Sequence, residues 1–348
     1  MKRAVQLAAG ISVSVLALWL TVRGKDLGAI WAAARAADYR WLLPYFAVAL
    51  ACYALRIVRW GVLLEPMARV RPARLVAASA VGLMALIVLP FRLGELARPC
   101  LVAEGRLRAS AALSSIVVEH IVDALSVGLV LVAALLLLPD GTPGVGLLRF
   151  SAWVVLAGFS ALAAVLAFAW RSRATAVSSL TQLLAPVAPG LAERGAAMLG
   201  AFLEGLRLVS SGRRTLLLLL TVAYWATNAW AIALLARGFG FALTPAAAIT
   251  VVGAIVLGIM IPSGPGMLGT YQAGVVLGLS LFERGEGVAA RAVAFANVLW
   301  AAQLGFQVVL GVAFLFSREI DLSRIIVRSA RDLDADGVRP DPRERSRQ

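Results

Sequence analysis

The chain has 348 residues, of which 61% are hydrophobic and 15% are charged. A soluble domain has about 45–50% apolar and about 25% charged residues, so these values exclude an ordinary soluble protein and predict an all-α polytopic membrane protein. The formal net charge of +14 comes almost entirely from arginine. Because the arginines lie between and beside apolar runs, they indicate cytoplasmic loops and contact with anionic lipid headgroups rather than nucleic acid.

Eight apolar runs of roughly spanning length follow one another along the chain. They cover residues 4–22, 41–64, 74–90, 110–138, 148–169, 214–236, 244–261 and 288–316. The first run has the positive start of a signal peptide, but its apolar stretch is longer and no A-x-A cleavage site follows. We therefore expect a retained first span.

Three segments determine the expected orientation of the chain in the membrane. Residues 139–147 lack lysine and arginine, which places them outside the cell. Residues 171–213 and the tail from 317 to 348 are rich in arginine, which places both in the cytoplasm. We predict a bacterial cytoplasmic (inner) membrane protein with both termini on the cytoplasmic side.

These anchors agree only if residues 74–109 and residues 244–285 each enter the membrane and return to the same side. The sequence therefore predicts about six full spans plus two oppositely oriented re-entrant helical hairpins. One consequence is that residues 23–40 lie outside, although they carry arginine and lysine.

The two predicted hairpins resemble each other in sequence, with "IVLPFRLGELARPCLV" in the first and "IMIPSGPGMLGTYQAGVVL" in the second. Matching breaks within oppositely oriented segments are the pattern of an inverted repeat, which brings irregular backbone from both halves near the membrane midplane. We expect one transmembrane domain over residues 1–316, with residues 171–213 as a helical insert and residues 317–348 as a basic, partly disordered tail. A helix over residues 191–208 within the insert either lies at the membrane interface or packs on the bundle.

Five ionisable residues flank the first break or follow it in the next apolar run: Arg92, Glu95, Arg98, Glu119 and Asp123. Glu95 and Arg98 are three residues apart, and Glu119 and Asp123 are four apart, so each pair shares a helical face. Charges within a membrane face a cavity or one another, and this pattern predicts a buried ion network. The alternatives are mutual pairing without a ligand, or charges at headgroup level that only set topology, which is our interpretation of Arg106 and Arg108.

The second break is uncharged and rich in glycine. Its candidate residues are Pro262, Gly264, Gly266, Gly269 and Gln272. Glycines at a helix start can leave consecutive N–H groups available, so the pattern predicts an anion-binding turn. Any helix break also requires such residues, and a purely structural turn remains the alternative.

Several polar residues stand alone within apolar runs. For Tyr224, Asn228, Asn297 and Gln303 we expect hydrogen bonds between helices. Arg56 and Arg59 lie near the end of the second run, where we expect them to extend toward the headgroups, with phosphate contact as the alternative. One histidine and two distant cysteines, Cys52 and Cys100, predict no disulfide framework, no metal site and no cofactor.

Three motifs in order, "RLGELARP", "VVEHIVDALSVG" and "PSGPGMLGTYQAGVVLGLSLF", resemble the flippase-like transmembrane domain of the lysylphosphatidylglycerol synthase family. The resemblance covers nearly the whole chain and implies a role in moving a lipid between leaflets. The family's synthases add a soluble domain that makes the lipid; the short tail here leads us to expect a stand-alone member that is not an enzyme. Many members carry an acid at the position of Gln272, so the resemblance leaves the identity of the lipid open.

We therefore predict a protein that binds and translocates an anionic phospholipid or a polyprenyl-linked lipid. The chain contains no GxxxxGK[ST] motif, which favours passive or ion-coupled movement. Two alternatives stay open: an integral-membrane transferase acting on a lipid-linked sugar, and a non-catalytic lipid-binding scaffold. Membrane lipids are the expected partners; a homodimer or a complex with lipid-biosynthetic enzymes is left open.

Overall fold

A computed structural model describes residues 2–88, 94–103, 107, 109–136, 138, 142, 144–184, 186, 189–205, 213–261 and 263–319. All secondary structure in these ranges is helical. The helices of the first half are α1 (Lys2–Val22), α2 (Leu27–Ala36), η1 (Tyr39–Trp41), α3 (Leu42–Leu64), α4 (Pro72–Val88), α5 (Gly94–Val102), α6 (Ala109–Leu136) and α7 (Val145–Arg171). Those of the second half are α8 (Arg173–Leu184), α9 (Pro189–Gly205), α10 (Arg214–Arg237), α11 (Pro245–Met260), η4 (Pro265–Met267), α12 (Thr270–Ser280) and α13 (Val288–Leu315).

Each of the eight predicted apolar runs forms a helix. Within the described residues, five helical segments are long and apolar enough to cross a membrane: Tyr39–Leu64, Ala109–Leu136, Val145–Arg171, Arg214–Arg237 and Val288–Leu315. The apolar helices Ile11–Val22, Pro72–Val88 and Pro245–Met260 are shorter. The all-helical, multi-pass membrane class is therefore confirmed, whereas the number of full crossings and the two re-entrant hairpins stay predictions.

Two pairs of short helices pack closely, α4 against α5 and α11 against α12. A Cβ atom on Gly94 would overlap the backbone of Leu86, and a Cβ on Gly274 would lie 2.6 Å from the carbonyl oxygen of Ala254. Glycine at such contacts lets two helix backbones approach each other. Both pairs adjoin the predicted breaks, and α13 packs against α4 of the first pair and α12 of the second.

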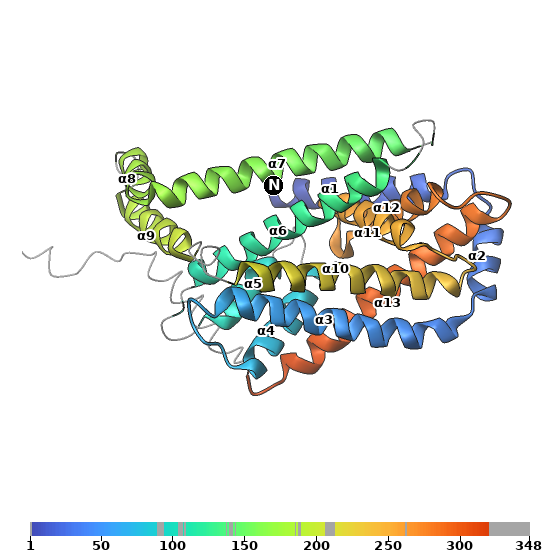
Figure 1. Ribbon diagram of the computed structural model, residues 1–348, viewed down its shortest axis with the longest axis horizontal. Helices are drawn as coiled ribbons and strands as arrows, with labels where there is room; N and C mark the ends of the chain where they lie inside the picture. The colour runs from blue at the N-terminus through green and yellow to red at the C-terminus, as the bar shows by residue number, and fades with distance from the viewer. Residues whose placement is uncertain are drawn as a thin grey trace, which may run out of the picture.

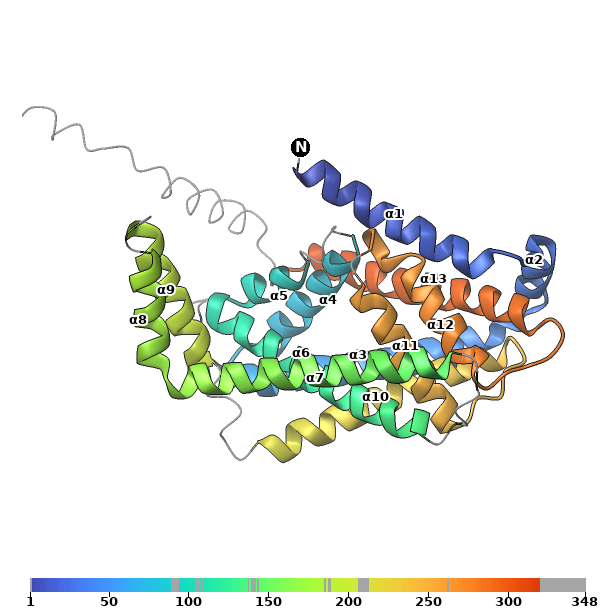
Figure 2. The same cartoon turned by 90° about the horizontal axis from the view of Figure 1, so that it is seen from above.

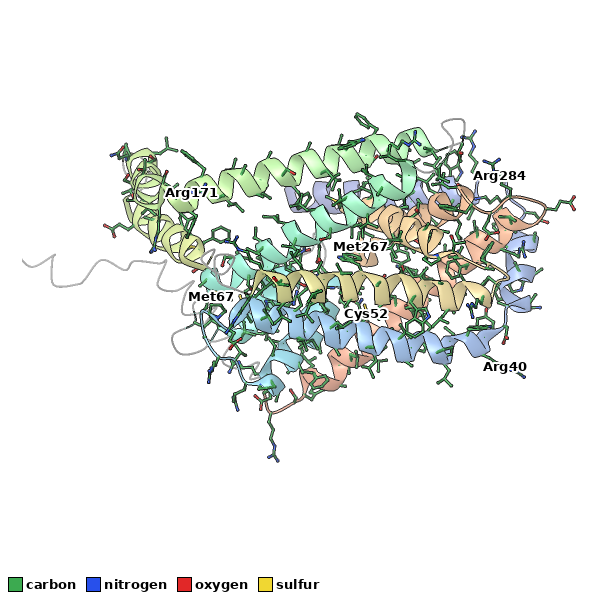
Figure 3. All side chains as sticks on the ribbon, viewed as in Figure 1. Arg40, Cys52, Met67, Arg171, Met267 and Arg284 are labelled. Carbon is green, nitrogen blue, oxygen red and sulfur yellow. The ribbon has the colours of Figure 1, made fainter. Side chains whose placement is uncertain are left out.

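The helix ends gather at two opposite ends of the molecule. Figure 1 shows α2 at one end and the α8–α9 pair at the other. Side chains labelled in Figure 3 follow this division, with Arg40 and Arg284 at the α2 end and Arg171 at the α8 end. Residues 23–40 thus lie opposite the arginine-rich insert, as the predicted topology requires.

Helix α1 and the helices of the insert pack on the outside of the bundle. Seen from above, α1 runs along one edge, and α7 crosses the face nearest the viewer (Figure 2). α1 packs against α12, and a Cβ on Gly269 would overlap the backbone of Ser14. Within the insert, α9 packs on α6 and Leu203 is fully buried, which favours the packed-helix alternative for this segment.

Candidate functional site

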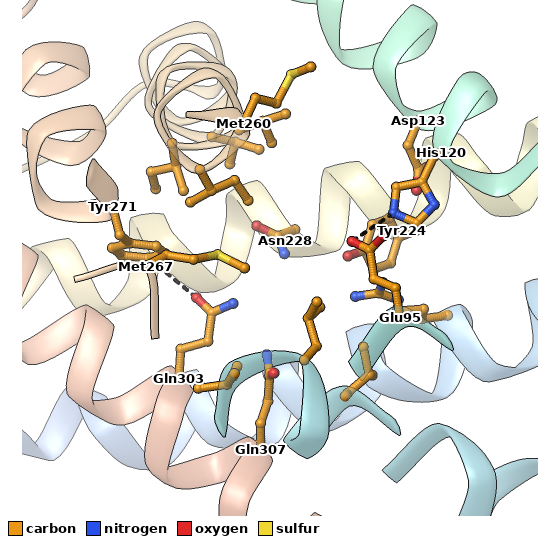
Figure 4. Close-up of a pocket in the computed structure, with 18 of the residues that line it drawn as sticks. Glu95, His120, Asp123, Tyr224, Asn228, Met260, Met267, Tyr271, Gln303 and Gln307 are labelled. Atoms are coloured by element: carbon orange, nitrogen blue, oxygen red, sulfur yellow. Dashed lines mark hydrogen bonds and ion pairs between the residues drawn. The ribbon is translucent and has the colours of Figure 1, made fainter. Parts of the chain in front are cut away.

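A cavity of about 250 Å³ lies among α3, α4, α5, α6, α7, α10, α11, η4, α12 and α13. Its wall has two chemically different sides (Figure 4). One side carries the ionisable residues Arg56, Glu95, Arg98, His120 and Asp123. The other carries uncharged polar groups and apolar side chains, among them Tyr271, Gln303, Gln307 and Met267. The cavity therefore joins the neighbourhoods of both helix breaks.

Glu119 on α6 lies at the centre of the charged side. It is 2% exposed, and three arginines surround its carboxylate. Arg59 Nη2 lies 2.9 Å from Oε1, Arg98 Nη1 lies 3.1 Å from Oε2, and Arg56 Nε lies 3.4 Å from Oε1. A carboxylate held by cations from α3 and α5 ties both helices to α6.

Asp123 follows Glu119 by one helical turn and shares its face. Both terminal nitrogens of Arg59 bind Asp123, with Nη2 at 2.7 Å from Oδ2, and Trp225 Nε1 donates to Oδ1 at 3.1 Å. The planar guanidinium of Arg59 thus bridges both acids and offsets their mutual repulsion.

The expectation that Arg59 extends toward the headgroups is wrong. Its side chain is 1% exposed, and its Cζ lies 4.7 Å from the centre of the Tyr224 ring. The reason is electrostatic: two acids on α6 at the same level hold the guanidinium inside. The signal in the sequence is the presence of Arg56 and Arg59 within an apolar run, which requires compensating acids but does not identify them.

Arg98 on α5 is the second buried arginine of the network. It is 2% exposed, and its Cζ lies 4.3 Å from the centre of the Trp60 ring. Its side chain passes against Gly82 of α4, where a Cβ would overlap it. One nitrogen, Nη1, reaches Glu119, but Nε and Nη2 have no hydrogen-bond partner in the part of the chain that the structure describes.

Glu95 lies beside the network rather than in it. His120 Nε2 is 3.4 Å from Glu95 Oε1, and His120 Nδ1 lies 2.7 Å from the carbonyl oxygen of Ile116. The structure therefore brings Arg98, Glu119 and Asp123 together and places Glu95 next to them through His120. Arg92 lies outside the described residues, as do Arg106 and Arg108.

At the second break, the prediction of available N–H groups is wrong for Gly264 and Gly269. The N–H of Gly264 donates to Ser14 Oγ of α1 at 2.8 Å, and the N–H of Gly269 donates to Gln272 Oε1 at 2.7 Å. Gln272 is fully buried and caps the start of α12 instead of facing an anion. Pro262 lies outside the described residues.

Gly266 has a different role. Its φ of +70° is a conformation that favours glycine, and its carbonyl oxygen accepts a hydrogen bond from Trp300 Nε1 at 2.8 Å. Gly266 also lines the cavity. The turn therefore forms a fixed wall of the cavity, attached to α13 through Trp300.

The lone polar residues mostly pair between helices, as predicted. Tyr271 OH donates to Gln303 Oε1 at 2.7 Å, Gln272 Nε2 donates to Asn297 Oδ1 at 3.4 Å, and Asn228 Nδ2 lies 3.7 Å from Cys52 Sγ. Tyr224 differs, since its ring lies beneath Arg59. These contacts are uncharged, unlike those at the first break.

Within the ranges described above, no group of three or more His, Cys, Asp or Glu side chains could hold a metal ion. Cys52 is buried and Cys100 is exposed, and neither forms a disulfide there. The polar groups that line the cavity are guanidinium groups, carboxylates, amides, an imidazole and phenols.

Fold and site together define a multi-pass helical membrane protein with a buried ion network beside an internal cavity. The profile of the family described as the lysylphosphatidylglycerol synthase TM region matches residues 7–326. The chain belongs to this family, and the resemblance seen in its three motifs is confirmed. Comparison with curated proteins and with solved structures gives no significant match in either case.

Proposed function

We propose that this protein binds a lipid whose headgroup carries a phosphate, and that it helps this headgroup cross the membrane. The lipid is an anionic phospholipid or a polyprenyl phosphate-linked lipid. The observation that supports the proposal most directly is Arg98, whose Nε and Nη2 lack partners in the described residues although the side chain is buried and lines the cavity.

The balance of charge around Glu119 points in the same direction. Three guanidinium groups, those of Arg56, Arg59 and Arg98, face two carboxylates in this part of the site. A buried charge is costly when it is not fully paired, and guanidinium binds phosphate oxygens with short, charge-assisted hydrogen bonds. A phosphate in the cavity would supply the missing partner for Arg98.

Helix lengths support the topology that translocation needs. α4 has 17 residues and α11 has 16, so at about 1.5 Å per residue they reach about 24–26 Å, short of a hydrocarbon core of about 30 Å. We propose that α4–α5 and α11–α12 are re-entrant hairpins of opposite orientation, and that α1, α3, α6, α7, α10 and α13 cross fully. The cavity between the hairpins would then lie near the midplane, with both termini on the cytoplasmic face of a bacterial inner membrane.

The test is redistribution of labelled lipid between leaflets. The purified full chain is reconstituted in liposomes that contain fluorescent phosphatidylglycerol, and a membrane-impermeant quencher reports the label exposed outside. Wild-type protein should bring inner-leaflet label to the quencher faster than protein-free liposomes. Arg98→Gln should slow this exchange about ten- to hundredfold, because it removes the charge that binds the phosphate.

Arg213→Gln is the matched control, because Arg213 pairs with Glu65 at 2.5 Å on the surface and lines no part of the cavity. It should exchange lipid at the wild-type rate. Arg98→Lys, which keeps the positive charge, covers the case in which Arg98→Gln fails to fold, and it should retain part of the exchange. Wild-type exchange equal to that of protein-free liposomes, for both phosphatidylglycerol and a polyprenyl phosphate-linked sugar, would contradict the proposal.

A further inference from the structure

The side of the cavity opposite the arginines carries amide side chains. Gln303 and Gln307 are four residues apart on α13 and therefore share a face, and Asn228 on α10 lies between them and the charged side (Figure 4). All three line the cavity. These amides are the polar groups of a side that is otherwise largely apolar, and their natural partner is an uncharged polar group.

These amides keep unused hydrogen-bonding capacity. Gln303 accepts from Tyr271 OH through Oε1, which leaves its amide nitrogen, and Asn228 uses one N–H in a weak contact with Cys52 Sγ. The side chain of Gln307 makes no hydrogen bond with any described residue. A primary amide offers donors and acceptors together, and a hydroxyl group is the ligand that uses both.

The acids of the site already have partners within the chain. Glu119 and Asp123 bind Arg59, Glu119 also binds Arg98, and Glu95 faces His120. An ammonium group entering the cavity would compete with a side chain of the protein at each of these carboxylates. Amine-bearing headgroups are therefore disfavoured, while the partnerless nitrogens of Arg98 favour a phosphate.

We infer that the headgroup is a phosphodiester that carries free hydroxyls, such as a glycerol or a sugar, with its phosphate at Arg98 and its hydroxyls at Asn228, Gln303 and Gln307. This inference rests on the proposed function and names the class of lipid that the same cavity takes. The arginine side binds the charge, and the amide side distinguishes a hydroxyl-bearing headgroup from a bare phosphate.

The experiment measures which lipids stay on the purified full chain, by native mass spectrometry after incubation with equimolar phosphatidylglycerol, phosphatidic acid, phosphatidylethanolamine and an aminoacylated phosphatidylglycerol. Phosphatidylglycerol should be retained about fivefold more than phosphatidic acid, which has the phosphate but no headgroup hydroxyl. Phosphatidic acid bears at least as much negative charge, so charge alone predicts the opposite order. A second arm replaces phosphatidylglycerol with a polyprenyl phosphate-linked hexose and distinguishes a phospholipid from a lipid-linked sugar as the source of the hydroxyls.

Gln307→Met removes one amide and keeps the length of the side chain. It should lower retention of phosphatidylglycerol about three- to tenfold and leave retention of phosphatidic acid unchanged, because only phosphatidylglycerol has headgroup hydroxyls that the Gln307 amide can bind. The matched control is Gln182→Met, an exposed glutamine on α8, which should change neither lipid.

Equal retention of phosphatidylglycerol and phosphatidic acid by the wild type, or preferred retention of either amine-bearing lipid, would overturn the inference without needing any variant. Equal loss of all lipids in Gln307→Met would overturn it as well. A failure of the proposed function gives another result: the wild type would then retain no more of any lipid than Arg98→Gln does.

Discussion

The two helix breaks are similar in sequence and packing but differ in their polar contents. Beside the α4–α5 pair, guanidinium groups and carboxylates meet at Glu119. Beside the α11–α12 pair, the polar contacts are uncharged: a serine, a glutamine and a tryptophan bind the backbone of the turn. The two regions therefore share a pair of closely packed short helices, whereas the polar side chains around each pair are chemically different.

The two regions are therefore suited to different roles. Charges within a membrane need compensation, so a charged region in which Arg98 has two nitrogens without a hydrogen-bond partner among the described residues is suited to an anion. A break whose amides are bound by the chain is suited to holding a fixed shape. Variants in each region test this contrast.

Glu119→Ala should cause the largest loss of stability, about 3–5 kcal/mol. The substitution leaves Arg98 without its carboxylate partner and removes one of the two carboxylates that bind Arg59. Thermal unfolding of the purified protein in detergent measures the effect. Glu65→Ala, at the exposed pair with Arg213, is the matched control and should change stability by less than about 1 kcal/mol. Similar melting temperatures for both variants would mean that the network contributes nothing.

Gly274→Ala tests the close packing of the uncharged region. The added methyl would lie 2.6 Å from the carbonyl oxygen of Ala254, so we expect a loss of about 1–3 kcal/mol. Gly158→Ala on α7 is the control, with no atom within 4 Å of the added carbon. It should stabilise the protein slightly, because alanine favours a helix over glycine by about 1 kcal/mol. Effects of the same sign in both variants would contradict the packing described for α11 and α12.

Gln272→Leu distinguishes a helix cap from an anion-binding residue. Removing the acceptor of the Gly269 N–H should cost about 1–2 kcal/mol, while lipid retained per folded molecule stays at the wild-type value. Thermal unfolding measures the stability, and native mass spectrometry measures the lipid retained per folded molecule. Loss of lipid without loss of stability would restore the anion-binding interpretation of this turn.

Arg213→Ala should have the smallest effect, below about 1 kcal/mol, because the pair with Glu65 is about two-fifths exposed on each side. Its contribution should fall further as salt is added, since exposed pairs are screened. Melting curves at two salt concentrations check this. A salt-independent loss as large as that of Glu119→Ala would remove the distinction between the two kinds of ion pair.

Much of the fold could be predicted from the sequence, because apolar runs of spanning length have few alternatives in a membrane. All eight runs form helices, and the pairing of Arg98 with Glu119 follows from the cost of burying either alone. Helix α2 was not predicted: it is a short helix of 10 residues whose start is capped by Asp26, a local signal too weak to stand out among long spans.

The rest depended on which partners the fold brings together. Arg59 lies 64 positions before Asp123, so its pairing is a property of the packing of α3 on α6 and not of either segment alone. At the second break, the amides looked available because Ser14, which binds Gly264, lies 250 positions away. Local patterns locate polar groups within spans but do not reveal how distant helices satisfy them.

The most direct test of the central claim is an experimental structure of the protein in nanodiscs that contain phosphatidylglycerol. Lipid phosphate density should lie inside the cavity, within about 2.7–2.9 Å of Arg98 Nη2, with the glycerol toward Gln303 and Gln307. Lipid bound only to the outer surface, with water or a protein side chain filling the hydrogen bonds of Arg98, would contradict it.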